Sequence, residues 1–126
     1  MCMFVENTIK IRRAFRRITC WKIVGWDNEN RIWTGPHYGT DSYVEGKILK
    51  SDKNISVLDC KVTHGLHTYA DEAEARIKLR YLNKLHIGGY CLVKCKIPMF
   101  SRFIKGIGEN GMCCYVSEKL KVIKFV

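Results

Sequence analysis

The sequence predicts an α+β fold: a largely antiparallel sheet, one central amphipathic helix over about 71–86, and a short basic N-terminal helix. Short runs rich in β-branched and aromatic residues, bounded by turn residues, recur on both sides of one helix-periodic segment. This order favours an antiparallel sheet over repeating β-α-β units. The 126 residues, 47% of them hydrophobic, suit a single domain with a basic segment 1–17 and an α+β core 18–126.

The N-terminal helix is predicted over residues 7–17. Ile11, Phe15 and Ile18 share one face at helical spacing, and basic residues occupy much of the remaining surface. These are four arginines within six positions: Arg12, Arg13, Arg16 and Arg17.

Strands follow from local composition, because branched and aromatic side chains suit a pleated, half-buried surface. Asp27 to Asn30 and Ser51 to Asn54 have the composition of turns. The predicted strands are 18–26, 31–34, 43–50, 55–62 and 66–69 before the central helix, and 90–97, 103–107, 112–116 and 120–126 after it.

The central helix has the clearest signals. Asp71 and Glu74 resemble a capping box, and Gly88-Gly89 ends the periodic segment. An i, i+4 stripe is expected to face the core, and its members are Ala73, Ile77, Tyr81 and Leu85.

Charge is concentrated at the two ends of the chain. Residues 1–26 carry six basic residues and one acid, residues 27–89 carry nine of each, and residues 90–126 carry seven basic residues and two acids. If the ends meet, they form one positive surface that attracts nucleic acid, acidic proteins or ribonucleoprotein particles. Arginine suits phosphate because its planar fork donates two parallel hydrogen bonds. The predicted nucleic-acid-binding residues are Arg12, Arg13, Arg16, Arg17, Lys22, Trp26, Lys94, Lys96, Arg102 and Lys105. A solvated basic face is the alternative.

The three tryptophans lie beside the arginine run. Aromatic side chains among basic residues are typical of surfaces that stack on unpaired bases. Large aromatics also dominate small cores, which is the alternative for each of the three. We expect Trp26 to support the arginines.

Seven cysteines at irregular spacing are a poor disulfide framework and favour a reducing compartment. Residues 1–10 lack the apolar core of a secretory signal, and no segment has the length of a membrane helix. We therefore expect a cytoplasmic protein without membrane contact, cofactor, metal or catalytic site. Two alternatives stay open: a metal site at Cys60, His64 and His67, completed by Cys91 and Cys95, and a nucleophile at Cys113 or Cys114.

A nucleotide-binding alternative rests on His37 and Tyr69. His37 precedes Tyr38-Gly39-Thr40, and Tyr69 ends a strand that leads into the central helix. This arrangement resembles part of the ADP-ribosyltransferase fold, although Tyr38 interrupts the His-Gly-Thr unit. The resemblance implies a pocket that holds His37 and Tyr69 together, with transferase activity or nucleotide binding as the expected function.

Residues 20–126 also resemble a group of small phage and prophage proteins. The matching motifs are Trp21-Lys22-Ile23-Val24, Gly65-Leu66-His67-Thr68-Tyr69, Val93 to Pro98 and Tyr115 to Leu120. The resemblance implies a counter-defence protein of the anti-CRISPR kind, acting in the host cytoplasm on RNA or a ribonucleoprotein effector. The alternatives are the ADP-ribosyltransferase-like function and a pure protein–protein inhibitor of a host protein. The oligomeric state is not predicted.

Overall fold

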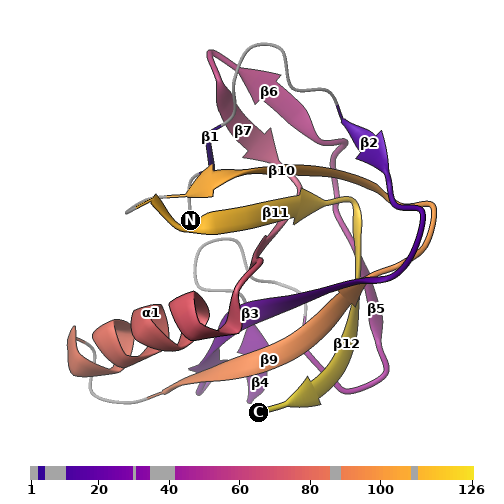
Figure 1. The fold of residues 1–126 in the computed structure, drawn as a ribbon. Coiled ribbons are helices and arrows are strands. Elements are labelled where there is room, and N and C mark those ends of the chain that lie inside the picture. Colours follow the sequence, from indigo (N-terminus) through magenta and orange to yellow (C-terminus); the bar gives the residue numbers. More distant parts are fainter. Residues whose placement is uncertain (1–2, 5–10, 30, 35–41, 86–88, 109–110) are drawn as a thin grey trace.

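The computed structural model describes residues 3–4, 11–29, 31–34, 42–85, 89–108 and 111–126. Within these ranges the chain forms strands and one helix (Figure 1). The elements are β1 (Met3–Phe4), β2 (Arg12–Arg13), β3 (Ile18–Asp27), β4 (Ile32–Thr34), β5 (Ile48–Lys50), β6 (Ser56–Leu58), β7 (Lys61–His64), β8 (Leu66–Tyr69), α1 (Glu72–Leu85), β9 (Tyr90–Ile97), β10 (Arg102–Gly108), β11 (Cys113–Ser117) and β12 (Lys119–Phe125).

All the described strands belong to one antiparallel sheet in the order β5-β12-β9-β3-β8-β11-β10-β1-β7-β6, with β4 paired to β3 and β2 paired to β10. The sheet is strongly bent. Figure 1 shows β10, β11 and β7 in an upper layer and β3, β9 and β12 in a lower one. The layers join where β3 pairs with β8, a junction with the single register pair Trp21 and Tyr69.

Strand β3 is buried on both faces, because alternate residues enter two separate cores. Cys20 and Val24, both 0% exposed, pack with Val93 and Leu120 in one core. Ile23 lies in the other core, which also holds Leu92, Ile104 and Val116. A strand that is covered on both faces has a nearly continuous apolar sequence, and residues 18–26 have such a sequence.

The central helix was predicted correctly, and its capping aspartate is confirmed. Asp71 Oδ1 accepts hydrogen bonds from the backbone N–H groups of Ala73 (2.7 Å) and Glu74 (3.3 Å). Glu74 does not complete a capping box. Its carboxylate instead accepts a 3.1 Å hydrogen bond from the backbone N–H of Cys113 in β11. This bond fixes the first turn of α1 against the upper layer.

The predicted core face of the helix was wrong. Ile77, Tyr81 and Leu85 are 53–57% exposed, and the buried face carries Ala75, Leu79 and Leu82. Both sets have helical spacing, so periodicity alone does not separate them. The small Ala75 side chain, fully buried, is the one that allows the helix to lie close to the sheet.

The predicted fold class was also wrong, because the described chain is mainly β with a single helix. The basic N-terminal helix is not formed: residues 11–17 are extended or bent, and Arg12–Arg13 pair with β10 as β2. A helix would place Arg12 beside Arg16 and Arg13 beside Arg17, and such i, i+4 like-charge pairs are unfavourable. The free edge of β10 instead offers backbone partners. Residues 7–10 of the predicted helix lie outside the described residues.

No helix in the described ranges combines the length and apolar character needed to cross a membrane.

Gly65, between β7 and β8, allows a close approach of strands and supplies a testable prediction. Its φ is 120°, and an added Cβ would collide with Val116 Cγ1 in the core. Gly65→Ala should lower the free energy of unfolding by about 2–4 kcal/mol, combining backbone strain with overpacking. Gly46→Ala is the matched control, since its φ is 84° and its Cβ would meet nothing within 4 Å. That control should lose about 1 kcal/mol in urea unfolding. Equal losses would contradict the proposed collision.

Candidate functional site

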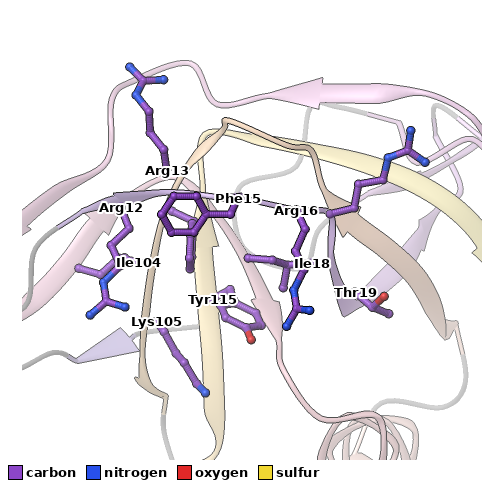
Figure 2. Close-up of a pocket in the computed structure, with 12 residues that line it drawn as sticks. Arg12, Arg13, Phe15, Arg16, Ile18, Thr19, Ile104, Lys105 and Tyr115 are labelled. Carbon is purple, nitrogen blue, oxygen red and sulfur yellow. The ribbon is translucent and has the colours of Figure 1, made fainter.

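A hollow of about 750 Å³ lies between the segment that precedes β3 and the strands β10 and β11. We call it the arginine groove, and its lining residues are Arg12, Arg13, Ala14, Phe15, Arg16, Arg17, Ile18, Thr19, Phe103, Ile104, Lys105 and Tyr115. Figure 2 shows Arg12, Arg16 and Lys105 extending to the same side of the segment, whereas Arg13 extends to the other. The lining contains five cations and no carboxylate.

Backbone hydrogen bonds hold residues 11–17, which we call the arginine segment, in place. The Ala14 N–H donates to the Ser101 carbonyl (2.9 Å), and the Phe100 N–H donates to the Ala14 carbonyl (2.7 Å). Ala14 is 2% exposed and packs in the core. Arg13 Nη1 donates to the Phe100 carbonyl at 3.1 Å. A buried alanine between arginines therefore anchors the segment and leaves the neighbouring long side chains in solvent.

The pairing of β2 with β10 creates an electrostatic cost. Arg13 lies directly opposite Arg102. Arg12 lies opposite Phe103, and Phe103 is two residues before Lys105 on the same strand. Like charges on directly opposed residues destabilise an antiparallel pair. Within the described ranges, the single ion pair is Arg76 with Glu72 on α1, so no described carboxylate forms an ion pair with the cations that line the groove. The arrangement is explained if an anion that is not part of this chain occupies the groove.

Two aromatic residues complete the groove. Phe15 lies among the four arginines and is 93% exposed, the largest exposed fraction of any large apolar side chain in the described residues. Tyr115 is half-buried, packs edge-on against Phe103 at 6.0 Å between centroids, and has Lys105 Nζ at 6.0 Å from its ring. Both rings are available to a planar ligand. Sequence reasoning placed Phe15 on the apolar face of a helix and missed this role. The signal was the period-2 alternation Arg13, Phe15, Arg17, which on a strand puts an aromatic among like charges.

Of the ten predicted binding residues, six gather at the groove: Arg12, Arg13, Arg16, Arg17, Arg102 and Lys105. Arg102 lies at its edge, where its backbone N–H donates to Glu118 Oε1 at 3.0 Å. Basic residues that precede β3 and basic residues of β10 therefore lie together here, which is the condition under which the charge distribution forms one positive surface. The other four lie elsewhere.

Lys22 is not on the binding surface. Its Nζ is buried and donates a 2.7 Å hydrogen bond to the His67 carbonyl. Burial lowers its pKa from 10.5 to about 8, with smaller opposing effects from nearby thiols such as Cys95 and Cys20. The alternation of β3 explains the error, because Lys22 shares the inward face of Cys20 and Val24.

Trp26 lies near the far end of β3, eight residues and about 26 Å along the strand from Ile18. Its ring packs edge-on against Trp33 at 5.2 Å, and Trp33 packs against Phe125 at 5.8 Å. Its 42% exposed fraction leaves a surface at that end, but not one beside the arginines. Lys96 is the strand partner of Thr19, which lines the groove. Lys94 lies two residues before Lys96 on β9 and is the partner of Trp21.

Four of the described cysteine thiols have raised pKa values. No disulfide joins the described cysteines, which are Cys20, Cys60, Cys91, Cys95, Cys113 and Cys114. Burial raises the pKa of Cys20 to about 12 and those of Cys91 and Cys114 to about 11, and it also raises the pKa of Cys95. The protonated thiol is a poor nucleophile and a poor metal ligand. No cluster of three or more potential metal ligands occurs in the described part of the chain, Cys60, His64 and His67 included.

The nucleotide pocket that the ADP-ribosyltransferase resemblance implies cannot be assembled from the described residues, because His37 lies outside them. Tyr69 is 7% exposed and packs in the core with Ile23 and Cys114.

Comparisons with known proteins found no matching family model, curated protein or solved structure.

Buried Lys22 gives a prediction for the pH dependence of stability. Between pH 8 and 10.5 the unfolded chain keeps the lysine proton and the folded chain loses it, so the free energy of unfolding rises with pH. The gain has an upper limit of about 3 kcal/mol. Lys22→Met lacks it, so wild type should gain stability relative to the variant across this range in urea titrations. The buried thiols act in the opposite direction but are common to both proteins. Parallel pH curves would rule out a lowered pKa for Lys22.

Proposed function

We propose that this protein binds single-stranded nucleic acid, RNA in the first place, at the arginine groove. The observation that carries the proposal is the exposed Phe15 ring set among four arginines that no carboxylate pairs with in the described chain. Arginine side chains neutralise phosphates and release counterions. Aromatic rings stack on unpaired bases whatever their sequence. A duplex hides its base faces, so the exposed ring favours single strands.

The biological setting is also part of the proposal. It comes from the resemblance of residues 20–126 to small phage and prophage proteins. A basic RNA binder of the phage counter-defence kind would occupy the guide RNA, or the nucleic-acid path, of a host effector. No catalytic function is proposed, because burial raises the pKa values of the Cys20 and Cys114 thiols and Tyr69 is buried. A pure protein–protein inhibitor would use the charge only to steer the encounter, and would bind no free RNA.

The arginines should set the salt dependence of binding. For single strands, each phosphate contact adds about 0.7 to the slope of log affinity against log salt. Arg12→Gln with Arg16→Gln should therefore lower the slope by about 1.4, measured by fluorescence anisotropy with a labelled oligouridylate. Lys61→Gln with Lys84→Gln is the control, because it removes the same charge from exposed positions on β7 and in the last turn of α1 that do not line the groove. A slope equally reduced by both double variants would mean that net charge alone attracts RNA.

The Phe15 ring should contribute affinity without affecting the salt slope. Phe15→Leu keeps an apolar side chain but removes the π face, and it should weaken binding roughly tenfold, since base stacking contributes about 1–3 kcal/mol. Phe15→Trp should preserve or strengthen binding. Leu58→Ala is the control for loss of an exposed apolar side chain, as Leu58 is 67% exposed on edge strand β6.

The same anisotropy series distinguishes the proposal from its rival. If Phe15→Leu and Phe15→Trp both bind as wild type does, the ring does not stack, and the groove is only an electrostatic surface. If wild type binds duplex RNA as tightly as a single strand of equal length, the preference for unpaired bases is wrong.

A further inference from the structure

One face of β5, β12 and β9 carries six lysines in three facing pairs. The register pairs Lys119 with Lys50, Lys121 with Lys96, and Lys124 with Lys94. Strand partners share a face, and the intervening residues Leu120, Val122 and Cys95 are all 0% exposed in the core. The six lysines therefore lie together on the opposite face, across β5, β12 and β9. We call this set the lysine face.

The lysine face has no internal neutralisation. Among the residues that the structure describes, no ion pair joins any of the six to a carboxylate. Facing like charges destabilise an antiparallel pair, and here three such pairs follow one another across adjacent strands. Solubility alone does not require lysines to face one another, because lysines distributed along a single strand would keep the surface equally well solvated. The accumulated repulsion is relieved when a polyanion lies across the strands.

The lysine face is continuous with the arginine groove. Thr19 lines the groove and is the direct partner of Lys96 on β9, and Lys96 in turn faces Lys121 on β12. Three interstrand steps of about 4.8 Å lead from β3 to β5, a path of about 14 Å. In Figure 1, β12 lies between β9 and β5 on the side where the segment from β2 descends to β3.

From this continuity we infer that the lysine face holds the phosphates of a nucleic-acid strand that leaves the arginine groove and crosses β9, β12 and β5. The inference rests on the proposed function and extends it: the groove holds bases and phosphates, and the lysine face holds phosphates alone. Lysine is a compact cation without the planar fork of arginine, which suits backbone contacts that carry no sequence preference. The footprint is then longer than the groove, and long strands gain affinity that short ones do not.

The test compares two lengths of fluorescein-labelled oligouridylate, about 6 and about 16 nucleotides, within the site sizes usual for single-strand binding. Lys96→Gln with Lys121→Gln removes the central facing pair. Affinity for the longer strand should fall roughly tenfold and its salt slope by about 1.4, whereas binding of the shorter strand should not change. Lys61→Gln with Lys84→Gln, which removes equal charge from β7 and the last turn of α1, should leave both affinities near those of wild type.

A stability measurement without nucleic acid shows that the variants fold and tests the repulsion itself. Lys121→Gln alone should raise the Tm at low salt, and the gain should disappear at high salt as the charges are screened. In a protein that already carries Lys96→Gln, the substitution Lys121→Gln should raise the Tm less than it does in wild type, because the charge that faces Lys121 is already gone. A lower Tm, or additive effects, would overturn the facing-pair argument.

The binding outcomes separate the inference from the proposed function. Unchanged affinity of Lys96→Gln with Lys121→Gln for the longer strand, while Arg12→Gln with Arg16→Gln loses affinity, overturns the lysine face and leaves the groove. The reverse pattern supports the lysine face and overturns the groove as the primary site. Equal loss for the longer and the shorter strand also overturns the inference, because the lysines would then act on the groove itself.

Discussion

The pairing of β3 with β9 is the constraint on which the proposed binding surface depends. Eight successive residues from Ile18 to Gly25 face Ile97 to Tyr90, and both faces of β3 are covered by core residues. This register leaves one route for the chain before Ile18, across the layers to the edge of β10. The arginine segment is thus placed by a strand of which only the first two residues, Ile18 and Thr19, line the groove. A slip of one residue would move Lys22 to the face of Ile23 and Trp21 to the face of Cys20 and Val24, so neither core would keep its present side chains.

Other strand pairings of the sheet place like charges close together at two sites. Arg13 faces Arg102 at the groove, and three lysine pairs face one another on β5, β12 and β9. Each facing pair costs a few tenths of a kcal/mol to about 1 kcal/mol, which is appreciable beside the total stability of a domain this size. Acidic residues are available in the chain, yet Glu74 and Glu118 accept backbone N–H groups instead of neutralising these cations. The positive field is therefore an unbalanced feature of the surface, as expected for a protein whose ligand carries the opposite charge.

Much of the fold was predictable from local sequence. The boundaries of the central helix and most strands followed from turn residues, capping and composition, since those signals act over a few residues. The N-terminal segment was not predictable, because helical and extended spacing both suit Ile11, Phe15 and Ile18, and the decision came from the distant edge of β10. The buried face of α1 was predicted wrongly for a similar reason. The helix has two apolar stripes, and packing against the sheet buries the one that contains Ala75 and Leu79.

At the site, the sequence predicted the arginines but not their aromatic partner. Trp26 was chosen for its proximity in sequence, yet β3 carries it to the opposite end of the strand, and Phe15 takes the place beside the guanidinium groups. The most direct test is photocrosslinking of the wild-type protein to a 4-thiouridine-labelled single strand of about 12 nucleotides, followed by mass spectrometry of the peptides. Crosslinks at Phe15 or Tyr115 are the predicted result. Crosslinks confined to the Trp26 and Trp33 cluster, with none on the groove, would contradict binding at the arginine segment.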